Sequence, residues 1–218
     1  MHRDCLPGKG WKVLRSLKGM LRQYHAVLAG GTALALQIGH RVSEDLDFFT
    51  GEEFPGESII AEIRKTGALF RIISEGKGYL VADVAGVKVS LFKYDYPFLE
   101  KPMRLDGIQV AGVLDIASMK VIAISQRRTR RDFIDLFFII EEIPFHKVAE
   151  HMVRRFGKER INPVHIGKSL AYFSDAESDP EPLYVKGKAL RWDTVKKFFR
   201  HHVKQFVLDL DMAVKGNR

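Results

Sequence analysis

The chain has 218 residues, a single cysteine and a net charge of +8 at pH 7, from 35 basic and 27 acidic side chains. One cysteine excludes an internal disulfide framework, and no apolar run is long enough to cross a membrane. Basic residues interrupt the apolar N-terminal segment, so we expect a cytoplasmic protein without a signal peptide. The positive charge favours a polyanionic partner, with nucleic acid as the first candidate.

The first 112 residues carry the patterns of both helices and strands. Helical spacing of apolar residues predicts an N-terminal amphipathic helix with Trp11, Leu14, Leu17 and Leu21 on its buried face. Glycines that end helices, and turns between short β-rich runs, predict further elements. These are a strand over 27–29, a helix over 32–38, a strand over 46–49, a helix over 57–65, and a meander of strands over 69–74, 79–84 and 87–94.

From residue 114 onward the apolar spacing is helical almost throughout. Pro144 and Pro163 interrupt it, the acidic stretch 174–182 predicts a long exposed loop, and a final helix is predicted over 192–210. The order of elements predicts an α+β fold. We expect a mixed sheet flanked by helices in residues 1–112 and a helical region, residues 113–218, packed on that core.

The most informative stretch joins a glycine turn to a pair of carboxylates. Gly30 and Gly31 come just before a predicted helix, whose N-terminal N–H groups suit a phosphate. Asp45 and Asp47 are two residues apart on a predicted strand and therefore share a face. Two carboxylates on one face attract Mg²⁺, which often bridges to substrate phosphates. The combination is what phosphoryl or nucleotidyl transfer requires.

Each half of this pattern has a structural alternative. Thr32 fits a helix N-cap as well as a phosphate contact, and both roles are compatible. An Asp-x-Asp usually marks a solvated strand edge, but the large apolar neighbours of Asp45 and Asp47 favour a semi-buried position. Two like carboxylates in such a place repel each other unless a cation neutralises them.

Three sequence blocks resemble the AbiEii/AbiGii-type toxin nucleotidyltransferases of the DNA polymerase β-like superfamily. They are the stretches 30–49, 115–124 and 127–136, in this order. The resemblance implies a nucleotidyltransferase-like mixed sheet and transfer of NMP from an NTP. It further implies Mg²⁺, with Mn²⁺ as a substitute, on Asp45 and Asp47. For some relatives it implies the 3′ end of tRNA as acceptor, and it implies an antitoxin protein encoded alongside the toxin.

Members of that superfamily usually add a third carboxylate on a later strand, and here the matching position is Ser90. Asp83 and Asp132 are candidates to replace it, although a surface strand aspartate is the simpler interpretation of Asp83. The missing acid leaves open an alternative function, a weakly active or inactive module of the same fold that binds nucleotide or RNA. A purely structural or partner-binding protein is a third and more remote alternative.

The second and third blocks contain further candidate site residues. Lys120 lies in the middle of an apolar helix face, so it either snorkels to solvent or lies under the active site and neutralises phosphate charge. Thr129 and Asp132 are close to a capping box, yet the family pattern places the pair Arg131 and Asp132 in the site. Asp135 is expected to fix a nearby arginine.

Other basic residues are candidates for nucleotide or RNA contacts. The loop that carries Arg41 and Ser43 leads directly to Asp45, so both residues are expected near the nucleotide. The run 127–131 holds four arginines, which are either a solvated charge cluster or contacts to RNA or triphosphate. The basic residues of the last predicted helix are a further candidate RNA surface, and its aromatic residues are expected to pack.

Overall fold

The computed structural model describes residues 1–216 and divides into two compact units at Gly112. The first unit, Met1–Gly112, holds a mixed sheet with helices, and the second, Val113–Arg218, is helical in its described part. This confirms the predicted α+β class. Within the described residues no helix has the length and apolar character that crossing a membrane requires.

The sheet has seven strands in the order β3-β4-β5-β2-β1-β7-β6. The pairs β2–β5 and β1–β7 are parallel and all other neighbours are antiparallel, so the sheet is mixed. The strands are β1 Val27–Ala29, β2 Leu46–Thr50, β3 Phe70–Gly76, β4 Tyr79–Val84, β5 Val87–Lys93, β6 Met103–Leu105 and β7 Ile108–Val110.

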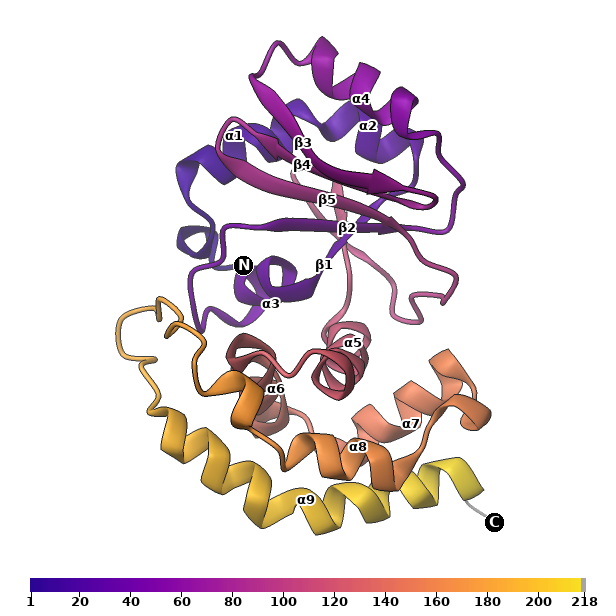
Figure 1. Ribbon diagram of the computed structural model, residues 1–218, viewed down its shortest axis with the longest axis vertical. Helices are drawn as coiled ribbons and strands as arrows, with labels where there is room; N and C mark the ends of the chain where they lie inside the picture. Colours follow the sequence, from indigo (N-terminus) through magenta and orange to yellow (C-terminus); the bar gives the residue numbers. More distant parts are fainter. Residues whose placement is uncertain (217–218) are drawn as a thin grey trace. The chain divides into compact units, whose positions relative to one another are not determined.

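The core of the first unit lies on one face of this sheet. Burial alternates along β2, where Leu46, Phe48 and Thr50 are buried while Asp47 and Phe49 are half-buried. Helices α1 (Gly8–Ser16), α2 (Lys18–Gln23) and α4 (Gly56–Lys65) pack on β5, β7 and the β3–β4 hairpin. Figure 1 shows α1 and α2 passing along one side of the strands. We call the other side, which carries Asp47, the open face.

Two local features of the first unit differ from the prediction. The N-terminal helix is broken at Leu17, and the Ser16 hydroxyl at the break donates to the Val13 carbonyl at 2.9 Å. Such local bonds compete with helix continuation. The short hairpin of β6 and β7 was not predicted, although its turn, Asp106-Gly107, has φ values of +51° and +82° and is a strong hairpin signal.

The second unit is built from five α-helices and two short 3₁₀ helices in its described part. Phe133 lies at the centre of an aromatic core in which Phe173, Trp192 and Phe199 surround it with ring centroids 5.1 to 5.8 Å away. The helices are α5 Val113–Gln126, α6 Arg130–Glu142, α7 Phe145–Phe156, η2 Lys158–Arg160, α8 Pro163–Leu170, η3 Ser174–Ala176 and α9 Trp192–Lys215.

The acidic stretch 174–182 is a loop with one 3₁₀ turn, and most of its residues are exposed, as predicted. Ala176 is nevertheless fully buried, and acids of the stretch bind groups of the same unit. Asp175 pairs with Arg128 at 3.0 Å and Asp179 accepts the Arg130 main-chain N–H at 2.8 Å. Charge pairing therefore fastens the loop to the start of α6.

Candidate active site

The glycine turn at the start of α3 (Gly30–Ile38) lies against Asp47. Gly30 follows β1 with φ +66°, and a Cβ built on it would lie 3.3 Å from Asp47 Oδ2. Only glycine adopts this backbone conformation without strain. The turn therefore brings the N-terminal N–H groups of α3 next to a carboxylate of β2.

Thr32 holds the loop that leads to the acids. The helix begins two residues before Thr32, so Thr32 is inside the first turn and its proposed N-cap role is wrong. Its hydroxyl donates to the main-chain carbonyl of Asp45 and lies 2.8 Å from Ser43 Oγ. Thr32 is 2% exposed, so the bonds that the structure gives it position Asp45 beside the glycine turn.

Asp45 comes directly before β2, and Asp47 is the second residue of the strand. Both are half-buried and continue the alternation with the buried Leu46 and Phe48. Asp47 is the register partner of Ala29 on β1 and of Ser90 on β5. The position expected for a third carboxylate is thus immediately beside Asp47, and it holds a neutral side chain that is 2% exposed.

Asp83 does not occupy that position. It lies on β4 in register with Lys88, and its Oδ1 accepts the Gly86 N–H at 2.9 Å, which stabilises the β4–β5 turn. Among residues 1–216 no group of three or more His, Cys, Asp or Glu residues could hold a metal. Two carboxylates are nevertheless a fitting donor set for Mg²⁺, which keeps several waters and takes other oxygens from substrate phosphates.

Arg41 and Ser43 belong to the loop between α3 and β2. Arg41 is 3% exposed and donates from Nη1 to the Val42 carbonyl at 3.2 Å. The main-chain N–H of Ser43 donates to the Cys5 carbonyl at 2.8 Å. These contacts hold the loop in place, and contact of either residue with a nucleotide stays a prediction.

Lys120, Asp132 and Asp135 form a buried ionic cluster in the second unit. Lys120 Nζ lies 2.9 Å from Asp132 Oδ1 and 2.5 Å from Asp135 Oδ2, and its side chain is only 6% exposed. Lys120 therefore does not snorkel to solvent. Asp135 binds this lysine, and its expected role beside an arginine stays a prediction.

Asp132 is the centre of this cluster. Its carboxylate accepts bonds from Arg127 Nε at 2.8 Å and from the Thr129 hydroxyl at 2.7 Å. Burial disfavours the charged form, but Lys120 and Arg127 outweigh burial and lower the pKa of Asp132 to about 2. Thr129 is the N-cap of α6, and its hydroxyl donates to the Asp132 side chain in place of the reciprocal backbone bonds of a capping box. Arg131 is the exposed neighbour of Asp132 in this first turn.

Two polar networks of the second unit were missed in the sequence. Asp115, at the start of α5, binds His151 Nε2 at 2.8 Å and its carbonyl accepts Arg155 Nη1 at 2.6 Å. Helical spacing of His151 and Arg155 on α7 was the available signal. The arginines of 127–131 were considered for solvent, RNA or triphosphate, yet Arg128 and Arg130 bind the segment 174–182.

The fold of the chain is similar to the folds of two solved proteins. JHP933 from Helicobacter pylori aligns with a TM-score of 0.57 at 18% identity, covering 93% of this chain and 92% of that one. MenT4, the nucleotidyltransferase toxin Rv2826c from Mycobacterium tuberculosis H37Rv, aligns with a TM-score of 0.59 at 17% identity, covering 96% of this chain and 88% of that one. These alignments show that the chain has a nucleotidyltransferase fold.

The family follows from the sequence comparison. The model of the nucleotidyl transferase AbiEii toxin of type IV toxin–antitoxin systems matches residues 13–213. The chain belongs to this family, which confirms the resemblance seen in the three blocks. An uncharacterized protein of Aquifex aeolicus (strain VF5), aq_aa25, is 39% identical over 189 residues, which cover 83% of this chain and 87% of that protein.

Proposed function

We propose that the protein transfers a nucleoside monophosphate from an NTP to the 3′ end of an RNA, with tRNA as the acceptor that the family resemblance suggests. The contact between Gly30 and Asp47 is the observation that carries this proposal. This contact supports the proposal because the N-terminal end of α3 and the Asp47 carboxylate are adjacent, so one triphosphate with its metal ion could contact both. The N–H groups of Gly30 and Gly31 would bind the β and γ phosphates.

Asp45 and Asp47 are the residues that would hold Mg²⁺, with Mn²⁺ as a substitute. When bound there, the ion would polarise the α phosphate and stabilise the pyrophosphate that leaves. Thr32 and Ser43 would keep Asp45 in position, because the Thr32 hydroxyl bonds to the Asp45 carbonyl and to the Ser43 hydroxyl. Arg41 would add positive charge near the triphosphate.

The ionic cluster of the second unit is our candidate for the remaining groups. Asp132 and Asp135 fix Lys120 Nζ at one point, so Lys120 would offset developing negative charge without reorganising. The family resemblance suggests a part for Asp132 in the reaction; its bonds to Lys120 and Arg127 would hold both cations in place. The exposed Arg131 beside it would contact phosphate.

The partners follow the same logic. NTP and RNA occur in the cytoplasm, and we propose that the reaction takes place there. The net charge of +8 suits an RNA substrate. Membership in a toxin–antitoxin family leads us to propose a cognate antitoxin that binds this chain.

Incubation of the purified protein with each radiolabelled NTP, MgCl₂ and total RNA tests the proposal. We expect one NTP to label RNA, and Asp47→Asn to abolish labelling. Asp83→Asn is the matched control, because this carboxylate lies on the same sheet but outside the glycine–acid site. Absence of labelled RNA with every NTP, or full activity in Asp47→Asn, contradicts the proposal.

Ser90 favours one alternative, an inactive module that binds nucleotide. A neutral residue beside Asp47 removes a ligand that a second metal ion would need. Calorimetry separates the two functions. An NTP affinity that is the same with and without Mg²⁺, together with no transfer to RNA, identifies the inactive binding module.

A further inference from the structure

Three aromatic residues form a row across the sheet, directly beside the row that contains Asp47. Tyr79 is the register partner of Phe92, and Phe92 is the register partner of Phe49, so the rings come from β4, β5 and β2. Asp47 and Ser90 are each two residues away along their strands, on the same face. We call Tyr79, Phe92 and Phe49 the aromatic row.

The aromatic row is not part of the core of the first unit. The core side of these strands is closed, with Leu91 and Phe48 at most 1% exposed. In the row, Tyr79 is 38% exposed, and Phe92 and Phe49 are half-buried. Phe49 also packs edge-on against Tyr94 with ring centroids 5.3 Å apart, so Tyr79 is the ring of the row that is exposed. A sheet face turned to solvent ordinarily carries polar side chains, so an exposed tyrosine beside the half-buried Phe92 indicates a surface that binds something.

The geometry of the rings suits stacking. The ring centroids of Phe49 and Phe92 are 5.5 Å apart with planes tilted by 30°. The ring of Tyr79 lies over the backbone of its register partner Gly76, where a Cβ would come within 2.5 Å of the ring. A glycine at position 76 therefore lets the Tyr79 ring lie along the hairpin surface, where it can offer a flat face.

The aromatic row and the glycine turn lie on opposite sides of Asp47. On β1, Ala29 is the register partner of Asp47, and Gly30 follows it directly. Val27, two residues earlier, is the register partner of Phe49. Gly30, directly after β1, therefore lies on one side of Asp47, and Phe92 and Tyr79 come from β5 and β4 on its other side.

We propose that the aromatic row stacks the terminal bases of a single-stranded nucleic-acid acceptor, an inference that rests on the proposed nucleotidyl transfer. In that reaction the acceptor hydroxyl oxygen bonds to the α phosphorus, the bond from that phosphorus to the pyrophosphate oxygen breaks, and the hydroxyl proton passes to solvent water. The attacking and leaving oxygens are roughly in line. With the leaving pyrophosphate on the glycine turn, the acceptor approaches from the opposite side, which is the side of the aromatic row.

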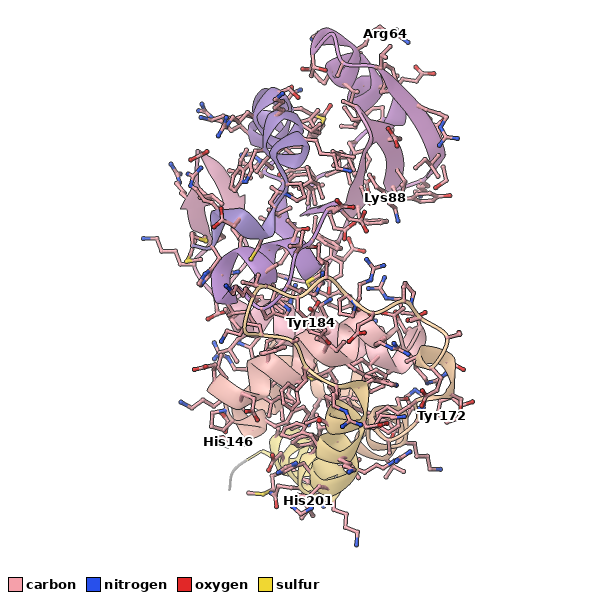
Figure 2. All side chains as sticks on the ribbon, turned by 90° about the vertical axis from the view of Figure 1, so that its left-hand side faces the viewer. Arg64, Lys88, His146, Tyr172, Tyr184 and His201 are labelled. Carbon is pink, nitrogen blue, oxygen red and sulfur yellow. The ribbon has the colours of Figure 1, made fainter. Side chains whose placement is uncertain are left out.

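Charge on the same face supports a nucleic acid over a protein acceptor. Arg71 and Lys88 flank Asp83 across β3, β4 and β5, and both basic side chains are exposed. Lys88, labelled in Figure 2, lies on the open face. Lys77, in the turn before Tyr79, is exposed as well. Aromatic faces that hold bases beside cations that track phosphates are the usual means of binding single strands.

The test measures binding separately from transfer. A short fluorescein-labelled oligoadenylate is titrated with the full chain, and fluorescence anisotropy gives its affinity without NTP. We expect Phe92→Leu and Tyr79→Ser each to weaken binding about tenfold, the loss of one stacked base. Phe92→Tyr and Tyr79→Phe keep a ring and are expected to bind as the wild type does. NTP affinity, measured by equilibrium dialysis, is expected to be unchanged in all four variants.

Each outcome bears on the inference. Equal oligoadenylate affinity in wild type, Phe92→Leu and Tyr79→Ser overturns it, as does an equal loss of NTP affinity in these variants. Tyr79→Ser replaces an exposed side chain and is not expected to unfold the protein, so a loss of binding in this variant reports on the ring. RNA binding that depends on the rings, without any transfer, supports the inference while the proposed function fails. If RNA is labelled and the KM for the RNA acceptor is the same in the wild type, Phe92→Leu and Tyr79→Ser, the inference is overturned and the proposed function stands.

Discussion

Asp47 and Ser90 are register partners on the parallel strands β2 and β5, with the serine almost fully buried. An acid placed at position 90 would therefore face Asp47 directly. Ser90→Asp is expected to lower stability by about 2 kcal/mol without metal, because it adds an unpaired buried charge. Mg²⁺ is expected to restore part of that loss.

Thermal denaturation with and without MgCl₂ measures this effect. Ser90→Asn is the matched control, with nearly the same shape and no charge. We expect Mg²⁺ to raise the Tm of Ser90→Asp more than that of Ser90→Asn. An equal rise in both variants would show that position 90 does not face a cation site.

Gly30→Ala separates backbone strain from damage to the site. Gly30 has φ +66°, so alanine there is expected to cost about 1–2 kcal/mol of stability. Gly86→Ala is the control, because Gly86 has φ +75° but open space around its Cβ position. Urea unfolding is expected to show similar losses for both. Only Gly30→Ala, whose methyl group would press on Asp47, is expected to lose transferase activity; if Gly86→Ala loses as much, the contact with Asp47 is irrelevant.

Lys120→Met tests the buried ionic cluster. Removing the lysine leaves Asp132 and Asp135 buried with less compensating charge, and breaking such a pair is expected to cost about 3–5 kcal/mol. The double variant Lys120→Met, Asp135→Asn is expected to recover part of this loss, since it also removes one of the two stranded charges. Urea unfolding measures both. A single variant as stable as the wild type would refute the importance of the pairs.

The depressed pKa of Asp132 predicts a pH dependence of stability. The pKa falls from 3.8 to about 2 on folding, so the stabilising effect is complete above pH 3.8 and is lost as the pH falls through about 2. The contribution is about 2 kcal/mol for a shift of this size. Urea unfolding from pH 5 to pH 2 is expected to show this loss in the wild type and a shallower one in Asp132→Asn. Parallel slopes would rule out Asp132 as the titrating group.

Local signals made much of the first unit predictable. Turn glycines bounded β4, whose limits match the prediction, and Gly39 ended α3 as expected. The alternation of Asp47 and Phe49 with buried neighbours also followed from the sequence, because strand side chains alternate faces. The register of Ser90 beside Asp47 required the parallel pairing of β2 with β5, which local patterns do not specify.

Long-range charge pairing explains most of what was missed in the second unit. Arg128 and Asp175 are 47 residues apart, and nothing in either neighbourhood identifies the other as its partner. The acidic stretch therefore had the composition of a free loop. Lys120 was recognisable as unusual because apolar residues surround it, but its two carboxylate partners lie on the next helix.

The pairing of β1 with β7 also limits when the molecule can assemble during synthesis. Val27 and Gln109 are neighbours in the sheet, so the central strand cannot gain both of its partners until the ribosome has released the chain beyond residue 110. The acids of β2 need β5 as well, which ends at Lys93. A nascent chain that ends before Lys93 lacks the strand that holds Ser90 beside Asp47, so the surroundings of the acids are completed only late in the synthesis of the first unit.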